Sequence, residues 1–259
     1  MCGVVGFLSS RAADWGEPVV QRMAQTILKR GPDAGGYWVD REGGAALGHR
    51  RLAVVDLSEA GHQPMHSTSG RYVIAFNGEI YNHLGLRAEL QACAPVAWRG
   101  HSDTETLLAG FEAWGVEAMM KKCIGMFALA TWDKKTRSLT LGRDRLGEKP
   151  LYYGWQGEGE GAVFLFGSEL KALKAHPSFA APVCRKALTL YMRLGYVPAP
   201  LSIYEGIGKL LPGHLLTVRP GDRTQRVQAY WNAKSVVEQN LTQPFSGTPA
   251  QAVDALELL

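Results

Sequence analysis

The chain has 259 residues, which is enough to bury the core of one large domain, or of one domain and part of a second; we favour the latter. Hydrophobic residues make up 46% and charged residues 20%, which excludes an intrinsically disordered chain. The net charge of +4 is small, lysines and arginines are scattered, and no apolar stretch approaches ~18 residues, so neither a nucleic-acid partner nor a membrane partner is expected.

Short runs of β-branched and aromatic residues bounded by turn formers predict strands. In chain order, we expect them at residues 4–8, 37–39, 52–56, 72–76, 126–132, 138–142, 151–155 and 163–166. The runs at 126–132 and 138–142 are joined by a short polar segment of hairpin length, which predicts antiparallel pairing.

Helical periodicity appears in fewer places. We expect helices at residues 18–29, 84–92, 102–114 and 184–194. The third begins at a capping-box pattern, with Ser102 as the N-cap and Glu105 three residues later. Helices and antiparallel strands in separate runs predict an α+β fold in which helices pack on the faces of sheets.

The last part of the chain has a different composition. Residues 236–249 are polar and contain two prolines, which is typical of a linker. Thr248 and Pro249 then have the pattern of an N-cap followed by proline at the first helical position. We interpret residues 1–235 as one domain, and residues 236–259 as a linker and the start of a truncated second domain.

The four cysteines predict neither a disulfide framework nor a structural zinc site. They are far apart, with no C-x-x-C pair and no histidine at ligand spacing, and are Cys2, Cys93, Cys123 and Cys184. We therefore assign no metal and expect free thiols in a reducing compartment. Since the first residues also lack the pattern of a signal peptide, we expect a cytoplasmic location.

Cys2 has a special chemical position. If Met1 is trimmed, as is usual before a small residue, Cys2 carries a free α-amino group beside its thiol. An α-amine titrates near ~7.7 to 8.0 and a cysteine thiol near ~8.5, so the amine can take the thiol proton without a histidine. The alternative is a small buried cysteine at the start of a strand.

Several ordered segments carry a resemblance to a known family. They are residues 1–7 (MCGVVGF), 30–33 (RGPD), 49–56 (HRRLAVVD), 76–82 (FNGEIYN) and 101–103 (HSD), with later strings at 142–153, 167–173 and 209–214. Over roughly residues 1–231, the chain resembles the glutamine-hydrolysing domain of class II amidotransferases, in the asparagine synthetase (glutamine-hydrolysing) branch. The resemblance implies the N-terminal nucleophile hydrolase fold, a four-layer αββα sandwich of two antiparallel sheets.

The resemblance also implies a reaction. Cys2 would attack the side-chain carboxamide of L-glutamine, ammonia would leave, and water would hydrolyse the γ-glutamyl thioester to glutamate. The Asn77 side-chain amide and the Gly78 backbone N–H are candidate donors to the oxyanion, and losing such a donor costs on the order of 10² to 10³ in rate. Asn-Gly is also the strongest short signal for a type I′ hairpin turn, so the family pattern decides between the two interpretations.

Glutamine carries an ammonium and a carboxylate at its α-carbon. We expect Arg51 to clamp the carboxylate, since a guanidinium donates two parallel hydrogen bonds, and Asp103 to bind the ammonium. Strand alternation sends Arg50 and Arg51 to opposite faces, and the family alignment selects Arg51. The alternatives are a solvated arginine and an acid favoured by a helix dipole, although Ser102 already suits the cap.

Other residues are assigned by the resemblance alone or given no role. Backbone groups expected to border the same pocket belong to Leu52, Val54, Val55 and Glu79. Residues 30–33 should form a loop near the site. The histidines expected to be structural or solvent-exposed are His49, His62, His66 and His101.

The expected partners follow from the resemblance. L-glutamine would be the substrate, and a C-terminal synthetase domain would use the ammonia with ATP and magnesium to amidate a carboxylate, aspartate in the asparagine branch. The chain itself has no P-loop or S-G-G-x-D-S pyrophosphate loop, so we assign it no cofactor. A homodimer is compatible with the resemblance. The alternatives are the same glutaminase serving a sugar or polysaccharide acid, and a catalytically silent interaction domain.

Overall fold

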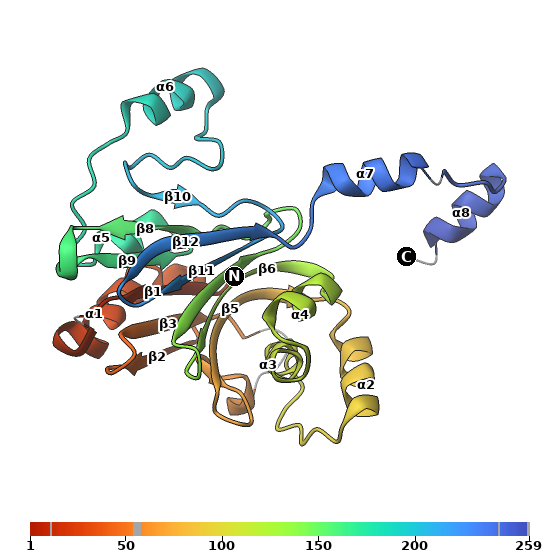
Figure 1. The fold of residues 1–259 in the computed structure, drawn as a ribbon, viewed down its shortest axis with the longest axis horizontal. Coiled ribbons are helices and arrows are strands. Elements are labelled where there is room, and N and C mark those ends of the chain that lie inside the picture. The colour runs from red at the N-terminus through yellow and green to blue at the C-terminus, as the bar shows by residue number, and fades with distance from the viewer. Residues whose placement is uncertain (11, 54–57, 243, 258–259) are drawn as a thin grey trace.

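The computed structural model describes the chain except residues 11, 54–57, 243 and 258–259, and except the side chains of residues 12–15 and 160. Two six-stranded antiparallel sheets stack face to face (Figure 1). The first sheet has the order β10 (Gly208–Lys209), β8 (Tyr152–Gln156), β9 (Val163–Gly167), β1 (Gly3–Leu8), β3 (Ala45–Arg51) and β2 (Ala34–Asp40). The second has the order β12 (Asp222–Ala229), β11 (His214–Arg219), β7 (Ser138–Arg143), β6 (Gly125–Asp133), β5 (Tyr72–Ile80) and β4 (Met65–His66).

Helices cover the outer faces of both sheets. The first sheet is covered by α1 (Ala12–Gln25) and α5 (Leu170–Lys174). The helical layer on the second sheet consists of α3 (Asp103–Trp114), with α2 (His83–Cys93) and α4 (Val116–Lys122) against it. The predicted four-layer αββα sandwich is therefore confirmed, and so is the predicted hairpin, which is formed by β6 and β7.

Three short turns and three further helices complete the helical segments of the described chain. The short 3₁₀ turns are η1 (Leu28–Arg30), η2 (Glu59–Gly61) and η3 (Gly159–Gly161). In Figure 1, α6 (Arg185–Leu194) projects from one end of the sandwich, while α7 (Ala233–Thr242) and α8 (Pro249–Glu257) extend beyond β12. No helix in the described ranges has both the length and the apolar character needed to cross a bilayer.

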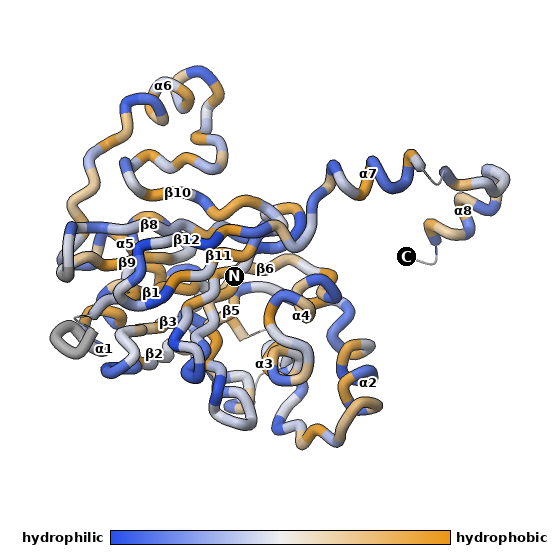
Figure 2. Tube along the Cα trace, in the orientation of Figure 1, coloured by the Kyte–Doolittle hydropathy of each residue, from blue (hydrophilic) through white to orange (hydrophobic). Residues whose placement is uncertain are grey.

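Side chains along β1 alternate between two hydrophobic cores, one on each face of the first sheet. Val4 and Leu8 pack between the sheets, whereas Val5 and Phe7 pack against α1 and α5. Hydrogen bonds to β3 on one side and β9 on the other make β1 a central strand. Figure 2 shows hydrophobic residues gathered in such central strands, whereas β12 is largely hydrophilic and exposed.

The absence of a side chain at Gly6 allows β1 to pack closely against its neighbours. A Cβ at this position would lie 2.3 Å from both the Ala46 carbonyl oxygen and the Phe166 ring. We expect Gly6→Ala to lower the free energy of unfolding by about 3 kcal/mol, because backbone and a buried ring must both move. Urea denaturation measures the loss. Gly161→Ala is the control, since nothing lies within 4 Å of its Cβ; an equal loss in both variants contradicts the packing argument.

The predicted strand at residues 52–56 is wrong in its placement. The strand in this region is β3, which ends at Arg51; Leu52 and Ala53 are not in a strand, and residues 54–57 lie outside the described part. The sequence of β3 is rich in small and basic residues and lacks the usual strand pattern. The strand is buried because Gly48 lets α1 pack closely against it. A Cβ at Gly48 would lie 2.9 Å from a Val20 methyl group.

Two helical predictions need correction. The predicted helix at residues 18–29 corresponds to the second half of α1, which is interrupted at Gly16 (φ 48°) and ends at Gln25. It ends early because the Thr26 hydroxyl and N–H both bond the Met23 carbonyl, which tightens the chain. The predicted linker also starts with α7 rather than irregular chain, since its prolines come only at positions 244 and 249.

The other predicted helices are confirmed. Ser102 accepts a hydrogen bond from the Glu105 N–H and caps α3, and α2 and α6 span the predicted ranges. Thr248 caps α8, with its hydroxyl accepting from the Gln251 N–H. The division into domains at residue 235 stays a prediction.

Candidate active site

Cys2 lies directly before β1, at one end of the central strand of the first sheet. Its Sγ atom is half-buried and accepts a hydrogen bond from the Leu52 N–H at 3.3 Å. The Arg30 Nε atom donates to the Cys2 carbonyl at 2.9 Å, and Arg30 in turn pairs with Glu169. Hydrogen bonds exchanged between Val4 and Ser168 continue this restraint. The thiol is therefore held in a fixed place.

Asn77 and Gly78 lie inside β5, where they pair with Ala128 and Phe127 of β6. This excludes a hairpin turn at Asn-Gly. Side chains alternate along β5, and Val73 and Ala75 pack between the sheets. Asn77 continues that face, which points toward the first sheet and Cys2.

The Asn77 amide is an unsatisfied donor. The side chain is 1% exposed, and its Nδ2 atom has no hydrogen-bond partner in the described part of the chain. A buried amide N–H without a partner costs about 1 to 3 kcal/mol. Gly78 brings backbone to the same wall, and a Cβ there would lie 2.1 Å from the Met126 carbonyl oxygen. The Asn77 amide is thus a hydrogen-bond donor without a partner, and the next residue, Gly78, has no room for a larger side chain.

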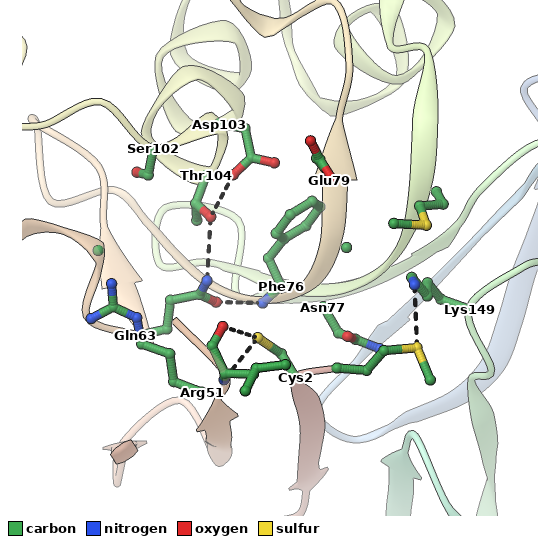
Figure 3. Close-up of a pocket in the computed structure, with 15 residues that line it drawn as sticks. Cys2, Arg51, Gln63, Phe76, Asn77, Glu79, Ser102, Asp103, Thr104 and Lys149 are labelled. Atoms are coloured by element: carbon green, nitrogen blue, oxygen red, sulfur yellow. Dashed lines mark hydrogen bonds between the residues drawn. The ribbon is translucent and has the colours of Figure 1, made fainter. Parts of the chain in front are cut away.

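One cavity of about 190 Å³ joins these residues (Figure 3). The predicted site residues that line it are Cys2, Arg51, Leu52, Asn77, Gly78, Glu79 and Asp103. Val54 and Val55 lie outside the described residues. The structure therefore brings together each predicted residue that it describes.

Arg50 and Arg51 face opposite ways, as predicted. Arg50 is buried and its Nε atom donates to the Gly31 carbonyl at 3.0 Å. Arg51 ends β3, donates to the Ser58 carbonyl at 3.0 Å and lines the cavity. Of the two arginines, Arg51 is therefore the one that lines the cavity.

Asp103 begins α3 and is 5% exposed. Burial raises the pKa of its carboxyl group above the ordinary value, against hydrogen bonds from the Ile80 and Thr104 N–H groups. Because burial without a cation disfavours the charged form, a cationic ligand in the cavity would stabilise the carboxylate. Ser102 serves as the cap, so Asp103 is not needed for that purpose.

Three residues near the cavity make contacts that the sequence analysis did not assign, although residues 30–33 were expected near the site. Gln63 accepts from the Phe76 N–H at 2.6 Å and donates to Thr104 at 3.2 Å, which joins β5 to α3. Arg30 holds the Cys2 carbonyl, and Lys149 lines the cavity beside Met1. Arg30 and Lys149 belong to strings that carried the family resemblance, but no chemical signal gave them a role; for Gln63 there was no signal.

The histidines do not contribute a base to the cavity lining. His49 is fully buried, and burial lowers its pKa to about 3, so the ring is neutral while bonded to the Phe76 carbonyl at 2.9 Å. Among the described residues, no three His, Cys, Asp or Glu side chains are grouped so as to hold a metal ion.

Known proteins resemble this chain in sequence over most of its length. Residues 1–231 match the family described as "Glutamine amidotransferase domain". The chain is 40% identical over 249 residues to asparagine synthetase [glutamine-hydrolyzing] 3 of Bacillus subtilis and 38% identical over 241 residues to asparagine synthetase [glutamine-hydrolyzing] 1 of the same organism. Each alignment covers 91% of this chain, but only 37% and 36% of the respective relative.

Solved structures support the fold. The allosteric regulatory enzyme of purine biosynthesis superposes with a TM-score of 0.66 at 17% identity, covering 89% of this chain and 49% of that one. Glutamine phosphoribosylpyrophosphate amidotransferase from B. subtilis gives 0.58 with the same identity and coverages. The family match over most of the sequence decides the assignment: the chain belongs to the glutamine amidotransferase domain family.

Proposed function

We propose that this domain hydrolyses L-glutamine to glutamate and ammonia through a γ-glutamyl thioester on Cys2. The observation that carries the proposal is the unpaired Asn77 amide in the same cavity as the Cys2 thiol. A donor left without a partner in the folded chain is suited to an oxyanion that exists only during the reaction. The family membership supports the same chemistry.

The charges of the cavity suit an amino acid substrate. Arg51 and Asp103 supply one cation and one anion, which matches the α-carboxylate and α-ammonium of glutamine. With both α-groups bound there, the side-chain carboxamide extends toward Cys2. The carboxamide carbon is then the electrophile that the thiol reaches.

The chemical steps balance with the groups present. After Met1 is removed, the Cys2 α-amine accepts the thiol proton and Sγ attacks the carboxamide carbon. Asn77 Nδ2 and the Gly78 N–H donate to the oxyanion, which collapses as the C–N bond breaks and the α-ammonium returns its proton to the leaving nitrogen. Ammonia departs, and a water molecule, deprotonated by the same amine, hydrolyses the thioester to glutamate and the free thiol.

The test uses the chain after its N-terminus has been determined by mass spectrometry. With Cys2 as the first residue, we expect equal amounts of glutamate and ammonia from L-glutamine, and one 6-diazo-5-oxo-norleucine adduct on Cys2. Absence of both products and adduct would indicate the silent interaction domain instead. A preparation that retains Met1 is the matched control and should be inactive, since its Cys2 nitrogen is an amide.

The described residues do not show how the ammonia is used. We propose that it passes to a synthetase-type domain, as the names of the relatives suggest, with ATP and magnesium used there and not here. Aspartate is the favoured acceptor; a sugar or polysaccharide acid is the alternative, and assays of a longer chain with each acceptor distinguish them. We also propose a cytoplasmic location, where thiols stay reduced. The homodimer stays a prediction, which sedimentation velocity would test.

Replacing Arg51 tests the substrate clamp. We expect Arg51→Ala to raise KM for glutamine by roughly 10- to 100-fold with a much smaller change in kcat, because a charge-assisted pair of hydrogen bonds to the α-carboxylate is lost. Steady-state kinetics measures both constants. Arg41→Ala, at an exposed arginine, should match the wild type; a drop confined to kcat in Arg51→Ala contradicts the clamp.

A further inference from the structure

Lys149 places a positive charge in the cavity with no acidic partner. The residue is 6% exposed, and its ammonium group pairs with no carboxylate of the described chain. Its nearest recorded partner is the thioether sulfur of Met1, at 3.3 Å from Nζ. Burying an ammonium without a compensating anion is unfavourable, so the position calls for a physical explanation.

The backbone around Lys149 is fixed by two neighbouring side chains. Asp144 is 1% exposed, and its carboxylate accepts from the N–H groups of Lys149, Glu148 and Phe127. Arg143 donates from Nε to the Lys149 carbonyl at 2.8 Å. The ammonium is therefore directed into the cavity by a rigid loop, and not by a flexible surface segment.

The cavity places this charge next to the start of the mature chain. In Figure 3, Arg51 and Lys149 lie on opposite sides of Cys2, and the Met1 side chain occupies the space beside Lys149. Once Met1 is removed, that contact is lost and the new α-amine of Cys2 is the group left on that side. Met1 is thus joined to Cys2 through the peptide bond and to Lys149 through its side chain.

We propose that Lys149 is a positioning residue whose charge keeps the α-amine of mature Cys2 neutral near neutral pH, so that this amine can accept the thiol proton. A nearby cation disfavours the protonated amine and favours the thiolate, so the charge acts in the same direction on both groups. The inference rests on the proposed function, because it concerns the base of that reaction.

The other charges near Cys2 do not duplicate this effect. Arg30 is paired with Glu169, and the Asp144 carboxylate beside the Lys149 backbone is held by backbone N–H groups. The charges that line the cavity are Arg51, which is assigned to the substrate carboxylate, and the acids Glu79 and Asp103. The two acids would favour a protonated amine, and Arg51 is countered by the α-carboxylate when glutamine binds. Lys149 is then the cation that offsets the charge of these acids on the Met1 side of Cys2.

The test follows the alkylation of Cys2 against pH. Processed wild-type chain and the variants Lys149→Met, Lys149→Gln and Lys149→Arg are treated with iodoacetamide, and the rate at each cysteine is read from peptide masses. We expect the Cys2 midpoint to rise by about one pH unit in the Met and Gln variants, the size of effect of a unit charge several ångströms away, and to stay near wild type in Lys149→Arg. The acid limb of kcat/KM for glutamine should move with it.

Controls are built into the chain. The exposed Cys93 reports on the reagent in every sample and should not shift, and Lys135→Met removes an exposed lysine elsewhere. An unchanged Cys2 midpoint in both neutral variants, or an equal rise in Lys149→Arg, overturns the proposal. A wild-type chain that makes no ammonia while its Cys2 midpoint still depends on Lys149 overturns the proposed function instead, so the two failures are distinguishable.

Discussion

Cys2→Ala is expected to release no ammonia from L-glutamine, because no other nucleophile in the chain is assigned to form the thioester. The folded state should be almost unaffected, since the Cys2 side chain is half-buried and its recorded hydrogen bonds are the weak thiol contacts to Leu52. Glutamate-dehydrogenase coupling measures turnover, and thermal unfolding measures stability.

The chain offers a matched cysteine for this experiment. Cys93 is an exposed free thiol at the end of α2, away from the cavity lining, and Cys93→Ala should retain full activity. Ammonia release by clean Cys2→Ala protein, at a rate above that of buffer, removes Cys2 as the nucleophile. Loss of activity in Cys93→Ala would indicate a general effect of thiol removal instead.

Asn77→Ala is expected to lower kcat by about 10² to 10³ with little change in KM, since the donor acts on the oxyanion and not on bound glutamine. The same variant should keep, or slightly gain, stability. In the described chain Nδ2 has no partner to lose, and the folded state no longer buries an unsatisfied donor. Kinetics and denaturation on one preparation test both statements.

Asn82 provides the opposite case. Its Nδ2 atom donates to the Lys122 carbonyl and its Oδ1 atom accepts from the Ile124 N–H, both at 2.9 Å. Asn82→Ala should therefore lose about 1 to 2 kcal/mol of stability and keep its kcat. If Asn77→Ala instead loses stability and keeps kcat, Asn77 is a structural residue and the oxyanion assignment is wrong.

The residues that line the cavity were predictable mainly through the family resemblance. Cys2 suggests a nucleophile by its own chemistry, but the choice of Arg51 over Arg50 needed the family pattern. Asn77-Gly78 was ambiguous from local rules, since the same dipeptide suits a turn and an oxyanion site. The pairing of β5 with β6 excludes the turn, and the oxyanion role stays a prediction.

The remaining features depend on contacts between distant segments. Apolar and polar residues do not alternate along β3, so its sequence alone does not predict a strand. Its burial comes from contacts with β1, β2 and α1. Arg30 reaches Cys2 only because a 3₁₀ turn lies beside the first strand. The charge of Lys149 is meaningful only once Met1 is placed against it. No local pattern contains such information.

The central place of β1 has a practical consequence for anyone preparing this protein. Neighbouring strands bond both edges of β1, so its register is locked and extra residues fused ahead of Met1 cannot be accommodated by sliding. They would extend from Met1, which lines the cavity, and would acylate the nitrogen that the proposed reaction needs. Purification handles therefore belong after α8, which lies away from the two sheets in Figure 1.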